Sequence, residues 1–241
     1  MSKFSKSRFF PPVELAEPEG VVLFGGKLSV EWLLDAYAHG IFPWPIFDGT
    51  DLVVWWSPDP RAVIEFERFH APRRLQRTCR SGQFKISCDR DYAAVLQGCA
   101  TAGDRLGRTW LTPAMIAAYQ KLHDAGHAHS IEVWQGEKLA GGIYGVTIGG
   151  LFAGESMFHY VRDASKVALV ALVEHLRARG YELFDIQQLT NHTASFGAVE
   201  IPRKEYMTRL ARALAKPVTF GSRLEFDAGA EKDSDSAQER R

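Results

Sequence analysis

The chain has 241 residues, enough for one large domain or two small ones. Its 29 basic and 29 acidic residues cancel, so a polyanionic partner must bind a local basic patch and not the whole surface. The cysteines Cys79, Cys88 and Cys99 are odd in number and form no C-x-x-C pair, which favours a reducing compartment. No apolar run has the length of a signal peptide or a membrane span, so we expect a cytoplasmic protein without membrane contact.

The region before about Arg61 is rich in aromatic residues, and we expect residues 1–60 to form a small N-terminal domain. Its first dozen residues are basic and are expected to lie loosely. Ser29 is a suitable N-cap for a helix that ends near Gly40. The following IFPWP contains two prolines and two aromatic residues, which predicts a rigid aromatic loop.

A basic segment follows, in which residues 68–85 include six lysines or arginines and no acid. Within it, PRRLQRTCRSG predicts a helix with Arg73, Arg77 and Arg80 on one face. A solvated helix face normally mixes charges of both signs, whereas an unmixed cationic face suits a phosphate backbone. An ordinary solvated face and a nucleic-acid contact both fit this pattern.

The rest of the chain predicts an α+β domain over residues 61–226. A helix capped by Thr112 precedes three short strands with glycine turns, HSIEVW, LAGGIYGVTI and LFAGESMF, which predict an antiparallel meander. The apolar helix ASKVALVALVEHLRAR follows, with Asp163 as its expected N-cap. The strand YELFDIQ and the helix KEYMTRLARALA complete a pattern consistent with an acetyltransferase-like (GNAT-type) architecture. The polar residues 227–241 are expected to be disordered.

Asp185 and Gln187 stand at the end of the buried strand YELFDIQ. Because side chains alternate along a strand, we expect these two on one face, with Phe184 and Ile186 on the other. A buried carboxylate and a buried amide both need partners. Either they satisfy each other and the backbone, or they face a ligand, and the residues alone leave both possibilities open.

Other candidate residues allow a structural and a functional interpretation. Glu155 could bind a cation or form an ordinary salt bridge. The sequence GESMF has Phe158 where the motif G-x-S-x-G needs its second glycine, so a serine hydrolase is not expected. The scattered histidines His127, His129 and His192 lack metal-ligand spacing, so no metal is assigned. The aromatic candidates either fill the core or wall a pocket that stacks a nucleobase: Tyr37, Trp44, Trp110, Tyr119 and Phe152.

The start of the apolar helix argues against coenzyme A. An acetyl-CoA-dependent enzyme of this architecture needs a glycine-containing turn there, where backbone N–H groups hold the pyrophosphate. This chain has HYVRDASK at that point, without glycine. We therefore expect no cofactor and an acyl group that arrives on another carrier.

Several motifs together resemble the leucyl/phenylalanyl-tRNA–protein transferases, over about residues 20–206. They are GIFPW, WWSPDPRAV, TWL, AYQKLHDAGHAHSIEVW, LAGGIYGV, LFAGESMF, ASKVAL, DIQ and HTASFGAVEIPR. The resemblance implies an acyltransferase that uses aminoacyl-tRNA as co-substrate and needs no coenzyme A. It implies transfer of a leucyl or phenylalanyl group to the N-terminal Arg or Lys of an acceptor protein, which creates a bacterial N-end-rule degradation signal.

The resemblance also implies roles for individual residues. Asp185 and Gln187 match the catalytic pair, in which Gln187, held by Asp185, positions or deprotonates the acceptor amine; substrate assistance is the alternative. Arg73, Arg77 and Arg80 match a helix that meets the tRNA acceptor stem. The positions implied to surround the adenosine and the aminoacyl group are Tyr37, Trp44, Trp110, Tyr119, Ile143, Phe152, Gly154, Glu155, Ser156 and Leu172.

Four alternatives remain open at this stage. Ile143 and Leu172 stand where relatives often have Met and Phe, and such changes allow a different donor preference, including methionine. Related transferases use acceptors with acidic N-termini, so the acceptor is also open. An acyl-CoA-dependent N-acyltransferase and a non-catalytic tRNA-binding module are the remaining alternatives.

Overall fold

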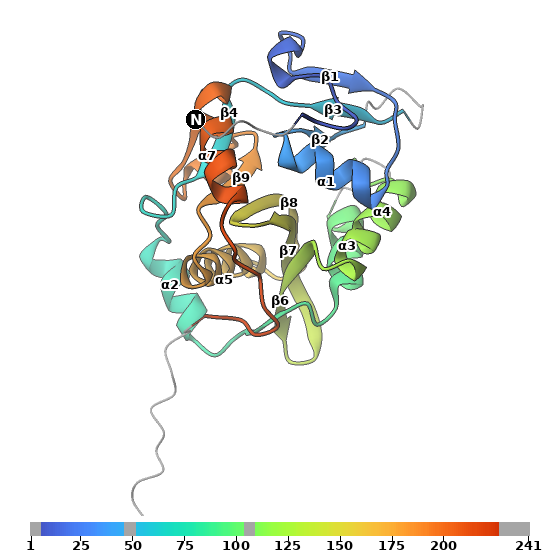
Figure 1. Cartoon of the computed structure of the whole chain (residues 1–241). Coiled ribbons are helices and arrows are strands. Elements are labelled where there is room, and N and C mark those ends of the chain that lie inside the picture. Colours follow the sequence, from blue (N-terminus) through green and yellow to red (C-terminus); the bar gives the residue numbers. More distant parts are fainter. Residues whose placement is uncertain (1–5, 46–51, 104–108, 227–241) are drawn as a thin grey trace, which may run out of the picture.

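The computed structural model describes residues 6–45, 52–103 and 109–226. Among these residues the strands form two sheets, and the chain passes from the first to the second after Trp56 (Figure 1). The first sheet is antiparallel, with the strand order β1-β3-β2. Its elements are the 3-10 helix η1 (Val13–Leu15), β1 (Val21–Phe24), α1 (Val30–Ala38), β2 (Phe42–Pro43) and β3 (Val54–Trp56).

The second sheet has the order β10-β4-β9-β8-β7-β6-β5. Its strands are β4 (Arg61–Ile64), β5 (Lys85–Cys88), β6 (Ala128–Gln135), β7 (Lys138–Ile148), β8 (Leu151–His159), β9 (Leu183–Gln187) and β10 (Ala198–Ile201). All neighbouring pairs are antiparallel except β8 and β9, which run parallel and pair only between residues 151–153 and 183–185. Beyond that point the two strands no longer pair, although β8 continues to His159.

Helices cover both faces of this sheet (Figure 1). The second group of elements includes α2 (Arg73–Arg80), α3 (Tyr92–Thr101), α4 (Pro113–Asp124), α5 (Ala164–Arg179), α6 (Asn191–Ala194) and α7 (Arg203–Leu214). Helix α5 packs on β6, β7 and β8, and α2 packs against α5. The helices α1, α3, α4 and α7 lie on the opposite face of the sheet. Their buried residues pack against strand side chains that point to that face, such as Tyr144 and Leu151.

The expected α+β organisation is confirmed, including the antiparallel meander β6-β7-β8. Ser29 and Thr112 cap α1 and α4 as predicted, by accepting hydrogen bonds from the backbone N–H groups of Trp32 and Met115. None of the described helices combines the length and the apolar character needed to cross a membrane.

One local expectation is wrong. The start of the chain is not loose between residues 7 and 10, because the Ser7 hydroxyl donates to Asp35 at 2.6 Å and the Phe10 ring packs edge-on against Trp55. Asp163 stands at the N-cap position of α5 as predicted, but its side chain makes no capping hydrogen bond. Its backbone is left-handed, with φ of 68°, and its carboxylate pairs with Arg74. The tail 227–241, expected to be disordered, lies outside the described residues.

Candidate active site

A cavity of about 220 Å³ opens where β8 and β9 cease to pair. Apolar side chains such as Leu169, Phe184 and Ile186 form most of its wall. Its size and apolar lining with a few polar groups are typical of a small-molecule site. Six residues that the sequence singled out line it: Trp44, Ile143, Gly154, Glu155, Ser156 and Gln187.

Gln187 reaches this cavity because its backbone leaves the extended conformation. Its φ is 58°, an unusual value for a residue other than glycine, and β4 and β9 shift register opposite Ala62. The Gln187 side-chain amide donates from Nε2 to Oε1 of Glu155 at 3.2 Å. The prediction that Asp185 and Gln187 present their side chains together is therefore wrong. Gln187 lines the cavity, and Asp185 does not.

Asp185 lies buried behind the cavity wall with four donors on its carboxylate. Arg61 donates from Nε at 2.9 Å and from Nη2 at 2.7 Å, and the Tyr206 hydroxyl donates at 2.9 Å. The fourth donor is the backbone N–H of Gln187, at 2.9 Å from Oδ1. Asp185 is thus a fully satisfied buried carboxylate, and it fixes Gln187 through the backbone and not through the side chain.

Arg61 is the buried cation that compensates this carboxylate. Its Nη1 donates to the carbonyl oxygen of Gly40, in the loop after α1, and its guanidinium lies over the rings of Phe42 and Tyr206. Burial alone would lower the pKa of Arg61, but the neighbouring Asp185 carboxylate raises it above its ordinary value. Arg61 and Tyr206 are not among the site residues predicted from the sequence. The signal for Arg61 was an arginine beginning the apolar strand RAVI, since such a residue needs a buried acid.

A chain of hydroxyl groups supports Glu155 from behind. The Tyr119 hydroxyl donates to Oε2 of Glu155 at 2.9 Å. The Tyr37 hydroxyl lies 2.7 Å from that of Tyr119, and either hydroxyl can be the donor of this hydrogen bond. Burial raises the pKa of Glu155 to about 7, and Asp185 adds to this shift, while the two hydroxyls and Arg61 oppose it. Burial also raises the pKa values of Tyr37 and Tyr119, so both stay protonated.

Two tryptophans stand beside the cavity. Trp44, which is 39% exposed, stacks on Trp110 with 4.9 Å between ring centroids and an interplanar angle of 19°. Trp110 in turn meets Tyr119 edge to face at 6.2 Å. This pair offers a flat aromatic surface next to the apolar cavity, which suits a planar heterocycle attached to an apolar group.

Leu172 and Phe152, like Tyr37, Trp110 and Tyr119, were expected at the substrate but do not line the cavity. Leu172 is fully buried within the core that α5 builds, and Leu169, one helical turn earlier, occupies the cavity wall instead. Phe152 packs edge-on against Phe184, with 5.3 Å between ring centroids, and so supports a wall residue from behind. Both positions act on the cavity through packing only.

The three predicted arginines Arg73, Arg77 and Arg80 are exposed on α2, and none of them pairs with a described carboxylate. The same helix is fixed to α5 by the buried side chain of Leu75 and by Arg74, which contacts Asp163 at 2.8 Å. Within the described ranges, no cluster of three His, Cys, Asp or Glu side chains could hold a metal ion.

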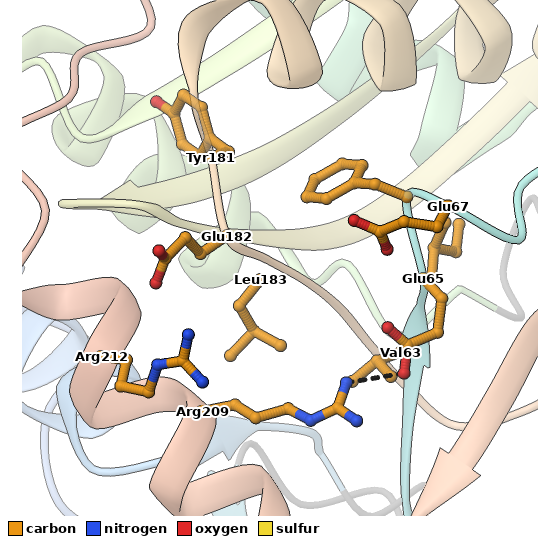
Figure 2. A pocket seen from close by; sticks show the side chains of 10 residues that line it. Val63, Glu65, Glu67, Tyr181, Glu182, Leu183, Arg209 and Arg212 are labelled. Carbon is orange, nitrogen blue, oxygen red and sulfur yellow. Dashed lines mark hydrogen bonds and ion pairs between the residues drawn. The ribbon is translucent and has the colours of Figure 1, made fainter.

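A second, larger cavity of about 460 Å³ is distinct in character (Figure 2). It lies between β4, the start of β9 and α7, and its charged lining includes Glu65, Glu182 and Arg212. Figure 2 shows the Arg209 guanidinium directed at Glu65, to which it donates at 2.6 Å. No residue singled out by the sequence lines this cavity, so volume alone does not locate the chemistry.

Comparison with known proteins decides the family. Residues 63–211 match the family model described as leucyl/phenylalanyl-tRNA protein transferase, and residues 26–59 match the model of its N-terminal domain. The chain belongs to the leucyl/phenylalanyl-tRNA–protein transferase family. Figure 1 thus shows the fold of one such transferase, and the cavity between β8 and β9 is its candidate active site.

Individual relatives agree with this assignment. A leucyl/phenylalanyl-tRNA–protein transferase of Anaeromyxobacter sp. (strain K) is 52% identical over 214 residues, which cover 88% of this chain and 91% of the relative. The protein of that name from Pseudomonas syringae pv. syringae is 46% identical over 86% of this chain and 91% of its own. A solved C-terminal domain of a putative lysylphosphatidylglycerol synthetase from Agrobacterium fabrum aligns with 68% of this transferase and 53% of its own chain. Its 12% identity and TM-score of 0.38 are too low to carry an argument.

Arg61→Met should lower the free energy of unfolding of this transferase by about 3–5 kcal/mol, because Asp185 would stay buried without its cation. Adding Asp185→Leu to that variant should recover part of the loss. Urea unfolding measures both effects. Arg209→Met is the matched control, since its ion pairs are partly exposed and should be worth about 1 kcal/mol or less. A loss at Arg61 no larger than the loss at Arg209 would contradict this account.

The pKa of Glu155 should also make the stability of the transferase depend on pH. The native carboxyl keeps its proton up to about pH 7, whereas an unperturbed glutamate releases it near 4.5. Between these values the native state binds more protons than the unfolded state, so stability falls as pH rises, by on the order of 2–3 kcal/mol. Glu155→Gln should remove this fall. The test is urea unfolding of both proteins at pH 5 and pH 8, and equal losses in the two would rule the prediction out.

Proposed function

We propose that this transferase moves a leucyl or phenylalanyl group from aminoacyl-tRNA to the N-terminal Arg or Lys of a protein in the cytoplasm. The product carries a new N-terminal residue joined by a peptide bond, which serves as an N-end-rule degradation signal. The observation that supports this proposal most strongly is the cavity between β8 and β9, with the Gln187 amide in its wall and the Trp44–Trp110 stack beside it.

The cavity suits the donor end of an aminoacyl-tRNA. The apolar wall around Ile143, Leu169 and Phe184 accepts a leucine- or phenylalanine-sized side chain, and the exposed face of Trp44 accepts the terminal adenine. Apolar pockets discriminate weakly, because one methylene is worth only about 1–3 kcal/mol. Whether the cavity excludes a methionyl group as donor must therefore be measured.

The start of α5 speaks against coenzyme A as the donor. The carboxylate of Asp163 occupies this helix end and pairs with Arg74 and Lys166. A pyrophosphate bound there would meet this carboxylate in place of the free N–H groups of a glycine turn. The cations near this helix end are already engaged, so an acyl-CoA-dependent reaction is the weaker candidate.

The reaction depends more on positioning the acceptor amine than on activating the ester, because an aminoacyl ester is already reactive. The acceptor α-amine attacks the ester carbonyl that links the amino acid to the terminal adenosine. The Gln187 amide holds the amine against the carbonyl, and Asp185 holds Gln187 in its left-handed conformation. Placement of this kind lowers the barrier without a covalent enzyme intermediate.

Helix α2 supplies the contact to the acceptor stem. Arg73, Arg77 and Arg80 are free of described acidic partners, so they can neutralise phosphates without first breaking an ion pair. The ion pair of Arg74 with Asp163 ties this helix to α5, whose Leu169 lines the cavity. The basic face of α2 and the reaction site are therefore linked through α5.

The proposed function predicts a defined product. The protein is incubated with Leu-, Phe- and Met-charged tRNA and with peptides that begin with Arg, Lys, Asp or Glu, and mass spectrometry reads the products. Leucyl and phenylalanyl additions to the Arg and Lys peptides are expected. Gln187→Ala should lower the rate by about 10²-fold or more while tRNA binding persists. Transfer to the Asp and Glu peptides alone would replace the proposal, and so would transfer that occurs only when acyl-CoA is supplied in place of charged tRNA.

A second prediction concerns α2. Reversing the charges of Arg73, Arg77 and Arg80 to Glu should weaken the binding of charged tRNA. The slope of log K against log salt should also become shallower, by the equivalent of at least about two phosphate contacts. Aminoacyl-adenosine, which lacks the acceptor stem, should be used at an unchanged rate. Binding titrations at several salt concentrations measure the slope, and an unchanged slope would remove α2 from the tRNA interface.

A further inference from the structure

We propose that Glu155 is the catalytic proton acceptor of this transferase, a role that deepens the proposed function and rests on it. The family resemblance gives the proton-handling part to Asp185 and Gln187. The geometry points instead to Glu155, which lines the cavity beside Gln187.

Asp185 cannot take that proton in the observed arrangement. Its two oxygens accept four hydrogen bonds, two from Arg61, one from Tyr206 and one from the backbone of Gln187. The side chain is fully buried and does not line the cavity. An incoming proton would have to displace a guanidinium that is paired at 2.7 Å, so Asp185 acts as a positioning residue.

Gln187 cannot serve as the final acceptor either. A primary amide has a hydrogen-bond-accepting oxygen but no site that holds a proton near neutral pH. Its Nε2 donates to Glu155, which leaves the amide oxygen free to accept an N–H bond from the substrate amine. An amine held in this way lies next to Oε1 of Glu155, which is 3.2 Å from the amide nitrogen.

Glu155 is the one acidic side chain among the described residues that line the cavity. Its pKa, raised to about 7 by burial, lies close to that of an α-amine, at about 8, which suits a proton exchange between the two groups. The ionisable groups that act on it come from six surrounding elements: Tyr37, Arg61, Tyr92, Tyr119, Tyr144 and Asp185. Only Arg61 is a cation in this set, and Asp185 compensates it.

The step balances without any further reactant. The nitrogen lone pair of the neutral amine forms the bond to the ester carbonyl carbon, and one N–H proton passes to the Glu155 carboxylate. The bond from that carbon to the ribose oxygen of the terminal adenosine then breaks, with the electron pair on the oxygen. The proton on Glu155 passes to that oxygen, so the products are a peptide bond and a free ribose hydroxyl, and Glu155 is again a carboxylate.

The experiment compares wild type with Glu155→Gln and Tyr119→Phe in single-turnover transfer. Aminoacyl-adenosine is the donor, an Arg-initiated peptide is saturating, and the pH runs from 5.5 to 9. The wild-type rate should rise with pH through two ionisations, that of Glu155 at about pH 7 and that of the peptide amine at about pH 8, so below pH 7 the logarithm of the rate should rise with a slope of about two. Glu155→Gln should lower the plateau by about 10²-fold or more and leave only the amine ionisation, with a slope of about one and the donor KM within about threefold of wild type. Tyr119→Phe removes a hydroxyl that stabilises the charged carboxylate, so the ionisation of Glu155 should move to higher pH.

Glu65→Gln is the matched control, because Glu65 lines the second cavity, and it should leave the profile unchanged. The inference is overturned if Glu155→Gln keeps more than a third of the plateau rate with the same slope as wild type, or if it changes only the KM values. If wild type transfers nothing to any peptide, the proposed function itself fails, which is a different outcome. Circular dichroism of each variant separates loss of chemistry from loss of folding.

Discussion

The buried ion pair between Arg61 and Asp185 is the interaction on which the rest of the site depends. Its guanidinium joins three parts of the chain, because it bonds the carboxylate on β9, the carbonyl of Gly40 after α1, and lies against Tyr206 of α7. Such pairs contribute little net stability but are costly to break. Here the carboxylate of the pair accepts a hydrogen bond from the backbone N–H of Gln187, so the function of the pair is to position the Gln187 amide.

The left-handed conformation of Gln187 is the local consequence of this arrangement. A strand that continued regularly would turn this side chain to the face of Asp185, away from the cavity. The backbone hydrogen bond to the carboxylate holds the residue in the uncommon region instead, and the parting of β8 from β9 leaves space for its amide. Strain at such a residue persists only when its surroundings enforce it. The cavity, the left-handed backbone of Gln187 and the Arg61–Asp185 ion pair therefore depend on one another.

Sequence periodicity predicted the meander, the capped helices and the basic face of α2, because each depends on spacing within one segment. The same reasoning failed at Gln187, since alternation along a strand cannot foresee a backbone that leaves the extended region. The family resemblance placed Leu172 at the substrate, whereas the rotation of α5 about its axis brings Leu169 to the cavity wall. Tyr206 carried no signal at all, because its role arises from contact between β9 and α7, which no local pattern records.

The two buried carboxylates of the site have different roles because their surroundings differ. Asp185 has a cation within 2.7 Å and every lone pair occupied, so it holds structure. Glu155 accepts hydrogen bonds from neutral groups, the Tyr119 hydroxyl and the Gln187 amide, and it borders the cavity. Burial raises the pKa of Glu155 to about 7, because neutral donors offset less of the cost of burying a charge than a paired guanidinium would. A proton acceptor with a pKa near neutrality therefore follows from pairing the buried Arg61 with the other acid.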